Sequence, residues 1–396
     1  MMLRNLFYIF SFALLIVACK SQKVVPSLPV DADVQAVDSV LLEPEYWVTA
    51  DLDTLYSLDE EVEIAITRVI KDTLTLIGVG DIMMGTNFPS ESYLPGNDGR
   101  DLWVEVSDTL SQADVTFGNL EGVILNDGGD QKKCRNPKVC YLFRSPESYL
   151  TNLLDAGFDV VSLANNHAGD FGQPGRENTM KSLDSLGINY AGLLTAPTTI
   201  FMIDGMRYGM VAFSPNIGTV SIHNEKRAIE LVEQLDSLVD VVIVSFHAGA
   251  EGSKHEHVTR KTEMFYGENR GNVYEFAHML IDHGADVIFG HGPHVSRAIE
   301  VYNERFITYS MGNFCTYGRF NLRGVNGIAP IVKIETNSEG KFLQGQLIPI
   351  YQPGAGGPKI DSKKRVISKI RELTKKDFPE SNLLIDDSGF ITYLNR

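Results

Sequence analysis

The chain has 396 residues, of which 43% are apolar and 22% are charged, a composition typical of a globular protein with one large domain or two modest ones. Its formal net charge is −16 and its pI is near 5.0. This charge excludes binding to nucleic acid by general electrostatic attraction, and an acidic ligand of any kind would need a local cation.

The first nineteen residues predict a bacterial lipoprotein signal peptide. One arginine precedes an apolar block from Leu6 to Ala18. As a helix this block spans roughly 20 Å, short of the roughly 30 Å hydrocarbon core of a bilayer, so a secretory signal is favoured over a membrane span. The block ends in "IVAC", which resembles a lipobox in which the cysteine, here Cys19, is acylated. The expected protein is extracytoplasmic and anchored in the cell envelope by its lipid; a plain secretory signal or a chance apolar start is the alternative.

Residues 20–71 show no sustained period and are predicted to form a tether and an N-terminal extension. Three further cysteines follow. In an oxidising compartment Cys134 and Cys140 of "CRNPKVC" are expected to form a disulfide, which leaves Cys315 unpaired. A metal site at these cysteines is the weaker alternative, because no second thiolate pair exists.

From residue 72 the chain alternates between strand and helix patterns, which predicts an α/β fold. The first strand is expected from Thr73 to Val79, and one later helix is expected to begin with Ser145 as its N-cap and Pro146 in its first turn. The other expected helices cover residues 101–113, 175–187, 225–238 and 272–284, and the other expected strands cover 114–119, 158–166, 240–247 and 286–290.

Two hairpins are predicted towards the C-terminus, one turning at Asn303 and Glu304 and one around residues 337–340, so the sheets should be mixed. One domain is expected over residues 72–352, with a tail over 353–396 that packs on it. The chain contains no GxGxxG, P-loop or GxSxG motif, which leaves dinucleotide binding, P-loop phosphoryl transfer and nucleophile-elbow hydrolysis without support.

Polar and ionisable side chains follow five of the predicted strands. Because ligands bind at the carboxyl ends of parallel strands, we expect these side chains to meet at one site. Several buried ionisable groups at one sheet edge are costly unless they bind a metal ion or each other. Oxygen and nitrogen ligands without thiolates suit one or two divalent ions of Zn, Mn or Fe, which favours a hydrolase. The set comprises Asp81, Asn119, Glu121, Asn165, Asn166, His167, His247, Glu251, His291 and His294.

The motifs "GVGDIMMG", "GNLEG", "SLANNHAGDFG", "FHAGAEG", "GADVIFGHGPHV" and "ITYSMGNF", in this order, resemble the poly-γ-glutamate capsule synthesis protein family (CapA-like), a branch of the calcineurin-like metallophosphoesterase superfamily. The resemblance covers roughly residues 72 to 350. It implies a four-layer α/β/β/α sandwich with mixed sheets around a dinuclear metal centre.

The resemblance also implies roles for individual residues. Asp81 would be the first-motif aspartate, Glu121 the bridging acid and His167 the acid that protonates the leaving group; these three would form the catalytic set. The metal ligands would be Asp81, Glu121, Asn166, His247, His291 and His294. The superfamily's first motif is Asp-x-His, and Met83 stands where that histidine would be, so one ion or two remain open.

Other residues have weaker assignments. Asn119 and Asn165 are expected to orient the ligands from behind, Glu251 to face substrate, and Asn313 to line the pocket or cap a turn. "KHEHVTR", with His255 and His257, is either a cationic grip on an acidic polymer or an ordinary surface loop.

The leading functional hypothesis is a lipid-anchored metal-dependent hydrolase-like protein for an anionic envelope polymer of the poly-γ-glutamate type. Its partners would be the polymer or its precursors, the membrane and a membrane-bound polymer synthase complex, with no nucleic acid. The alternatives are a non-catalytic polymer assembly or export component, which Met83 favours, and a phosphodiesterase.

Overall fold

The computed structural model describes residues 71–134, 140–354 and 356–394. The predicted signal peptide with Cys19, and residues 20–70 of the predicted extension, lie outside the described residues. Within the described part of the chain, no helix has the length and apolarity needed to cross a membrane.

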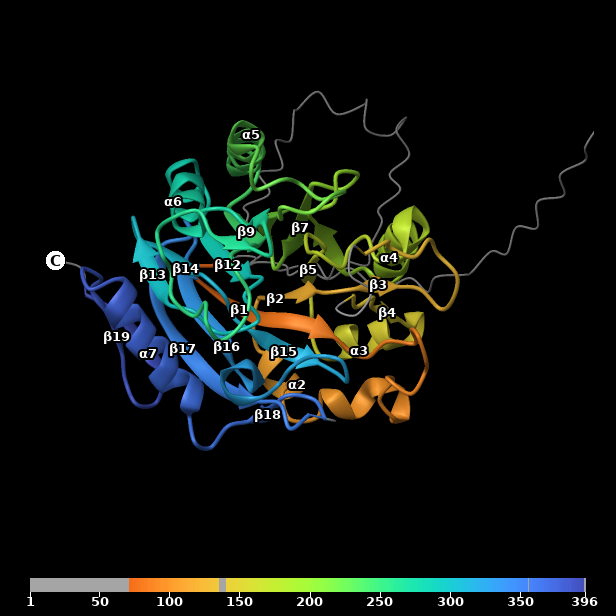
Figure 1. Cartoon of the computed structure of the whole chain (residues 1–396). Coiled ribbons are helices and arrows are strands. Elements are labelled where there is room, and N and C mark those ends of the chain that lie inside the picture. The colour runs from red at the N-terminus through yellow and green to blue at the C-terminus, as the bar shows by residue number, and fades with distance from the viewer. Residues whose placement is uncertain (1–70, 135–139, 355, 395–396) are drawn as a thin grey trace, which may run out of the picture. The chain divides into compact units, whose positions relative to one another are not determined.

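The larger of two main sheets has ten strands (Figure 1). Its parallel half contains β1, β2, β5, β6 and β15, and its other strands are antiparallel. The strand order is β19 (Leu383–Ile385), β20 (Phe390–Tyr393), β17 (Phe342–Tyr351), β16 (Ile328–Asn337), β1 (Thr73–Met83), β2 (Val115–Leu120), β5 (Val160–Ser162) and β6 (Asn189–Ala191), with β15 (Asn313–Thr316) beside β1 and β18 (Lys359–Ile360) beside β17.

The smaller main sheet has six strands, in which β8, β9, β12 and β14 run parallel and the two edge strands run antiparallel. The order is β13 (Ile299–Tyr302), β14 (Arg305–Thr308), β12 (Val287–His291), β9 (Val241–His247), β8 (Met206–Phe213) and β7 (Thr198–Ile203). Two short pairs complete the strands: β3 (Val123–Ile124) with β4 (Arg144–Ser145), and β10 (Met264–Phe265) with β11 (Glu268–Asn269). Asn303 and Glu304 form the β13–β14 turn, and both have positive φ.

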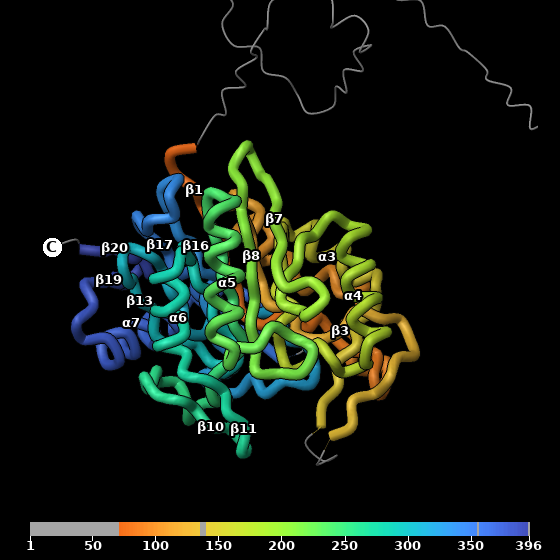
Figure 2. The backbone as a smooth tube through the Cα atoms, turned by 90° about the horizontal axis from the view of Figure 1, so that it is seen from above, coloured from red at the N-terminus to blue at the C-terminus, as the bar shows by residue number. Residues whose placement is uncertain are grey.

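Helices cover the outer faces of both sheets. The larger sheet packs against α2 (Ser107–Leu110), α3 (Leu150–Asp155) and α4 (Gly172–Leu186), and the smaller against α5 (Glu225–Asp236) and α6 (Val273–Asp282). Figure 2 shows α5 and α6 side by side over the smaller sheet. The short 3-10 helices are η1 (Asn97–Leu102), η3 (Glu147–Tyr149) and η4 (Gly324–Gly327).

The two sheets face each other across one apolar core. Phe117 of β2 and Phe289 of β12 are both fully buried, and their rings stack with centroids 5.1 Å apart. Strands with both faces covered must be apolar on both sides, which explains the continuous apolar runs in β8, β9 and β12. The predicted four-layer α/β/β/α sandwich with mixed sheets is confirmed.

The C-terminal tail is part of the sandwich. Strand β20 pairs with β17, and α7 (Arg365–Asp377) buries Val366, Ile367 and Ile370 in the core between the sheets. The larger sheet therefore extends beyond the predicted domain end at residue 352.

Two local predictions are wrong. Ser145 is not the N-cap of a helix but belongs to β4, where its hydroxyl donates to the Gly85 carbonyl at 2.6 Å. Pro146, in an extended conformation, is at the N-cap position of η3, the short helix before α3. The segment 101–113 contains the end of η1 and the single turn α2 instead of one helix. At Ser145, the pairing of β4 with β3 outweighs the local helix preference.

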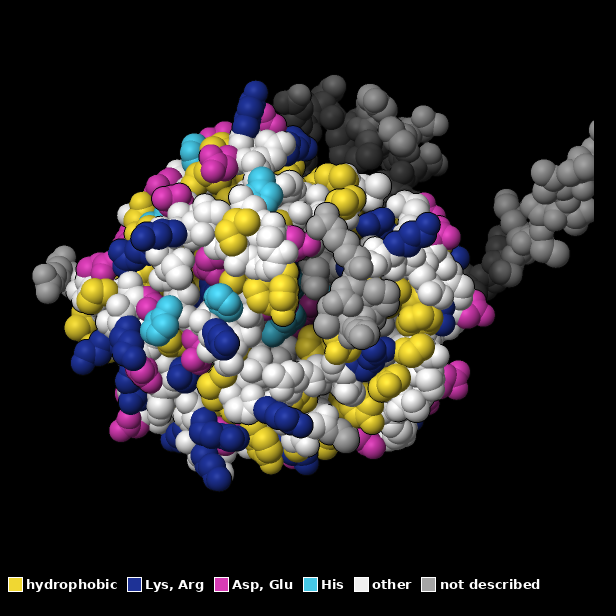
Figure 3. Space-filling model, viewed as in Figure 1, with side chains coloured by type: hydrophobic (Ala, Val, Ile, Leu, Met, Phe, Trp, Pro, Cys, Tyr) yellow, Lys and Arg dark blue, Asp and Glu magenta, His cyan; other side chains and the backbone are white. Residues whose placement is uncertain are grey.

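The surface seen in Figure 3 carries Lys and Arg side chains interspersed with Asp and Glu. Lys and Arg do not gather into one broad patch among the described residues on this face. Anion binding there would have to depend on individually placed cations.

Candidate metal centre

The site lies where the carboxyl ends of parallel strands from both sheets meet. Asp81 is in β1 and Glu121 directly follows β2, whereas His247 and His291 end the neighbouring strands β9 and β12. His247 and His291 are register partners, so their side chains leave the same side of the smaller sheet. The parallel strands of the two facing sheets thus bring carboxylates from one sheet and imidazoles from the other to one place.

Asp81 is a buried carboxylate held by three donors. His291 Nδ1 lies 3.2 Å from one oxygen and His294 Nδ1 lies 2.9 Å from the other, while the Asn119 amide donates at 2.9 Å. Burial by itself would raise the pKa of Asp81, but the hydrogen bonds and charges of His291 and His294 outweigh it and hold this pKa well below its usual range. Asp81 is therefore ionised.

Glu121 occupies the centre of the cluster. Its Oε1 atom lies 3.5 Å from His247 Nε2, 3.6 Å from His294 Nε2 and 3.9 Å from His167 Nε2. Burial raises the pKa of Glu121 to about 7, although the charge of His294 opposes the rise. Ligand atoms of Glu121, His247 and His294 all lie within 4.8 Å of one another, which is a geometry that can hold a metal ion.

The donor set passes a second test, because several of its buried ligand atoms have no hydrogen-bond partner. These atoms are both oxygens of Glu121, both ring nitrogens of His247, Nε2 of His291 and Oδ1 of Asn166. An unpaired buried polar atom costs about 1–3 kcal/mol. This many unpaired ligand atoms at one point fit a bound cation. Carboxylate, amide and imidazole ligands without thiolate fit a divalent ion such as Zn, Mn or Fe.

The histidines differ in their electrostatic environments. Burial lowers the pKa of His247 to about 3, so this ring is neutral and has lone pairs to offer. Burial would lower the pKa of His294 as well, but the carboxylates of Glu121 and Asp81 raise it to about 10. A metal ion must therefore displace a proton from His294.

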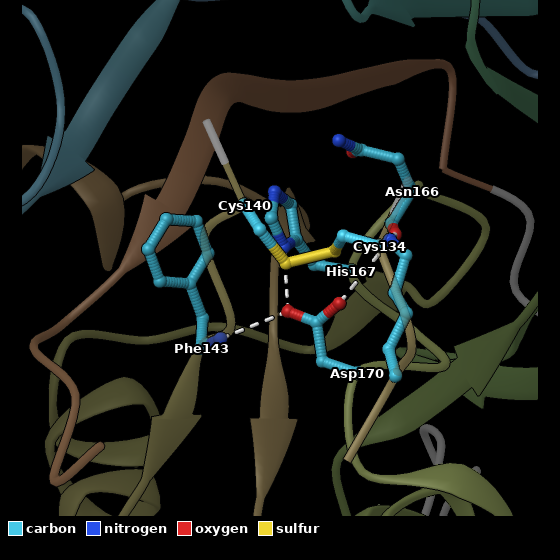
Figure 4. Close-up of a disulfide and its surroundings, with 7 residues drawn as sticks. Cys134, Cys140, Phe143, Asn166, His167 and Asp170 are labelled. Carbon is cyan, nitrogen blue, oxygen red and sulfur yellow. Dashed lines mark hydrogen bonds and ion pairs between the residues drawn. A yellow bond between two sulfur atoms is a disulfide. The ribbon is translucent and has the colours of Figure 1, made fainter. Parts of the chain in front are cut away.

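His167 is oriented by an aspartate that the sequence reasoning missed. Asp170 Oδ2 lies 2.6 Å from His167 Nδ1 and accepts from the Phe143 backbone N–H at 2.8 Å (Figure 4). The Phe143 ring packs on the imidazole with centroids 4.3 Å apart. Asp170 fixes the ring so that Nε2 points towards Glu121 and the cavity. The available signal was its position three residues after His167 in "NNHAGD".

A relay of amides connects Asp81 to the His167 backbone. Asn165 donates to the Asn119 side chain at 3.0 Å, and its own side-chain oxygen accepts from the His167 N–H at 3.0 Å. Asn119 and Asn165 are buried and lie behind the ligands. The two amides therefore fix the separation between the carboxylate of Asp81 and the imidazole of His167.

Residues 75–317 match the family described as "Bacterial capsule synthesis protein PGA_cap". The chain belongs to this bacterial capsule synthesis protein family. This membership confirms the resemblance inferred from the ordered motifs, and the chain is a CapA-like member of a family of capsule and poly-γ-glutamate biosynthesis proteins.

Two relatives from Bacillus are similar over much of the chain. The "PGA biosynthesis protein CapA" of Bacillus subtilis is 29% identical over 322 residues, 77% of this chain and 78% of that protein. The "Capsule biosynthesis protein CapA" of Bacillus anthracis is 27% identical over 262 residues, 61% of this chain, and the match spans 60% of that protein. A "Probable polyglutamine synthesis accessory protein" of Mycobacterium tuberculosis is 29% identical over 236 residues, 54% of this chain and 60% of that protein.

Solved structures are more distant. A hypothetical protein from Thermus thermophilus aligns with 71% of this chain and 100% of its own at a TM-score of 0.42 and 16% identity. A putative 5'-nucleotidase from Staphylococcus aureus aligns with 78% of this chain and 59% of its own at a TM-score of 0.40 and 15% identity.

In this family member Met83 supplies no imidazole. Its side chain is buried, and its sulfur accepts from the Gly85 N–H at 3.3 Å. Glu251 lines the cavity and forms an ion pair with Arg270. Asn313 does not line the cavity; its amide donates to the His294 carbonyl at 3.2 Å and so holds the turn that carries His294.

The segment "KHEHVTR" has part of its charge neutralised within the protein. His257 Nδ1 lies 2.7 Å from Asp377, and Arg260 forms an ion pair with Glu380. Both acidic partners come from the end of α7 and the residues after it. These contacts favour the interpretation of the segment as an ordinary surface loop over its interpretation as a cationic grip on an acidic polymer.

The structure joins Cys134 and Cys140 in a disulfide and leaves Cys315 free and buried. Figure 4 shows the disulfide beside His167 and Asp170. Cys134 also lines the cavity in front of the cluster. The bridge therefore belongs to the wall of the candidate site.

Proposed function

We propose that this chain is a lipid-anchored, extracytoplasmic, metal-dependent hydrolase or transferase that acts on amide bonds of an anionic envelope polymer of the poly-γ-glutamate type. The names of the Bacillus relatives support the polymer class. A lipid on Cys19 would hold the site at the membrane, near a membrane-bound polymer synthase.

One observation carries the enzymatic part. His294 and Asn166, two of the proposed ligands, line a cavity of about 340 Å³ together with the ring of His167. Asp170 holds one nitrogen of that ring, and the other lies 3.9 Å from the unpartnered Oε1 of Glu121. A site that only bound polymer would need no imidazole aimed at a metal cluster by a buried carboxylate. This pairing is what proton transfer to a leaving group requires.

The residues of the site would have separate roles in metal binding and proton transfer. Glu121, His247 and His294 would hold the ion, with Asp81, Asn166 and His291 completing the ligands. A bound Zn, Mn or Fe ion supplies Lewis-acid activation of water and of a polarised carbonyl. His167 Nε2, once protonated, donates its proton to the leaving nitrogen, because Asp170 keeps Nδ1 as the other donor of the ring. The Phe143 ring covers one face of the imidazole and limits water there.

Met83 favours a second candidate, a polymer assembly component that binds without catalysis. The absence of an imidazole at that position weakens one of the two metal positions of the superfamily. The catalytic proposal therefore needs only one firmly held ion.

The first test is the metal content of the full chain, purified without chelators and measured by plasma mass spectrometry. We expect one to two equivalents of Zn, Mn or Fe in the wild type and loss of the ion in the His291→Ala, His294→Ala double variant. Wild-type protein that stays free of metal after reconstitution would contradict the proposal.

The second test uses Asp170→Asn, with Asp108→Asn on the exposed face of α2 as the matched control. Release of γ-glutamyl products should fall about 10²–10⁴-fold in kcat while the metal stays bound, because the ring loses its orienting charge. Phosphoester substrates tested in parallel address the phosphodiesterase alternative. Unchanged turnover in Asp170→Asn and in His167→Ala would favour the assembly role.

A further inference from the structure

Two cavities meet at the loop that follows β15. The cavity of the metal cluster is lined by His167, His294, Arg319 and Phe320 among others. A second cavity, of about 620 Å³, is lined by Tyr93, Tyr317, Phe320 and Arg323 among others. Since Phe320 lines both, the two cavities are neighbours.

Arg319 stands at this junction between two tyrosine rings. Its guanidinium carbon lies 4.9 Å from the ring centroid of Tyr93 and 4.9 Å from that of Tyr141. Tyr141 directly follows Cys140 of the disulfide, and the Tyr93 carbonyl accepts from the Thr86 N–H at 3.2 Å. Both rings are therefore attached to fixed parts of the fold, and they hold the guanidinium in place.

The charge of Arg319 is not neutralised. Among residues 71–134, 140–354 and 356–394 its guanidinium forms no ion pair and no hydrogen bond. The contrast with Arg270 and Arg297 is clear, because each of these pairs with a glutamate, Glu251 or Glu263. Aromatic stacking leaves the N–H donors at the edge of a guanidinium available, and a planar fork of donors suits a carboxylate.

The walls of the larger cavity combine a cation with apolar surface. Arg323 is exposed there, and no described residue forms an ion pair with it. Tyr93, Tyr317 and Phe320 supply aromatic surface beside it. A chain that carries carboxylates separated by short methylene segments matches this combination, whereas the chain's net charge of −16 offers such a ligand no general attraction.

We propose that Arg319 binds a carboxylate of the substrate one unit away from the reacting bond, and that the larger cavity holds the continuing polycarboxylate chain. This subsite rests on the proposed function for the identity of the reacting bond. It makes Arg319 a specificity-determining residue that selects an extended anionic substrate over a single unit.

The test measures binding of γ-linked glutamate oligomers, a dimer and a hexamer, to the metal-loaded full chain by titration calorimetry. Arg319→Gln should weaken hexamer binding about ten- to hundredfold and reduce its salt dependence, because a charge-assisted bidentate contact is lost. Arg319→Lys should restore part of the affinity. Arg227→Gln, at an exposed arginine of α5, is the matched control and should bind as the wild type does.

The unfolding temperatures of all variants distinguish a binding effect from misfolding. If Arg319→Gln does not fold, the salt dependence of hexamer binding to the wild type still shows whether a cation takes part in binding. Hexamer binding that Arg319→Gln leaves unchanged would overturn the subsite. Equal affinity for a polyphosphate of matched charge would overturn the assignment to carboxylates.

The same variants distinguish failure of the subsite from failure of the proposed function. Arg319-dependent binding without any metal-dependent turnover would refute the enzymatic function and keep the subsite. Turnover of the hexamer with kcat/KM unaffected by Arg319→Gln would refute the subsite and keep the enzyme.

Discussion

Replacing Glu121 by Gln should have opposite effects on the metal-free and the metal-loaded protein. Glu121 is fully buried, and neither of its oxygens accepts a hydrogen bond from the described residues. Gln keeps the shape and removes the charge. We therefore expect the variant to be more stable than the wild type without metal and to gain little from added metal.

The magnitude follows from the pKa of Glu121, which burial raises from 4.5 to about 7. At about 1.36 kcal/mol per pKa unit, ionising this carboxyl in the folded protein costs about 3 kcal/mol above pH 7. This pKa already contains the attraction of the protonated His294 ring. Because Gln places an unpaired amide at the same buried position, a net gain of about 1–3 kcal/mol is expected.

The sign of the pH dependence is fixed by the raised pKa. Below pH 4.5 the carboxyl is neutral in both the folded and the unfolded chain, and wild type and variant should be equally stable at this position. Between pH 4.5 and about 7 the unfolded chain releases this proton while the folded wild type keeps it, so the wild type loses stability relative to the variant. Above pH 7 both states are ionised, and the difference in stability stays constant.

The assay is calorimetric unfolding of the full chain between pH 4 and 8, after dialysis against EDTA and again with Zn or Mn added. A gain of 1–3 kcal/mol corresponds to roughly 2–6 °C in Tm for a domain of this size. Glu230→Gln, at an exposed glutamate of α5, is the matched control. A Glu121→Gln variant that is less stable than the wild type without metal, at pH 8, would refute the reasoning, because Glu121 would then be a satisfied structural acid.

Three further predictions concern single groups. Burial, with the nearby charge of Asp114, raises the pKa of Asp159 to about 6. In urea unfolding, Asp159→Asn should therefore abolish a loss of stability between pH 4 and 6 and should raise the free energy of unfolding at pH 7 by about 1 kcal/mol. An unchanged pH profile would contradict this. Replacing Cys134 and Cys140 by Ser should cost about 2 kcal/mol of unfolding free energy, and equal stability of the reduced wild type would count against the bridge. Burial raises the pKa of the Cys315 thiol well above its usual range, so iodoacetamide should label Cys315 only in unfolded protein, as mass spectrometry can show.

Local patterns were sufficient to predict most of the sandwich. The apolar runs of β9 and β12 and the glycine-terminated helix α4 are visible in the sequence because burial and helix ending depend on residues that are neighbours in the chain. Ser145 shows the limit of this reasoning, since its serine-proline pattern is typical of a helix start while β3 pairs with the segment that contains it.

Side chains that work through distant partners were not predictable. Arg319 has no motif around it, and its importance appears only when Tyr93 and Tyr141, separated by nearly fifty residues, enclose it. Arg260 and His257 are basic residues in a basic segment, and only the positions of Asp377 and Glu380, at the end of α7 and just after it, show that carboxylates contact them.

The sequence alone determined the family, the fold class and the list of ligand-type residues, because ordered motifs at strand ends identify which side chains a parallel sheet presents at its edge. Tertiary structure decided how those residues are used. It placed Glu121 between His247 and His294, paired Asp170 with His167, and left the charge of Arg319 free at the mouth of the cavity. The physical reason is that pairing, burial and pKa depend on distances between atoms far apart in the chain, which only the packing of the two sheets sets.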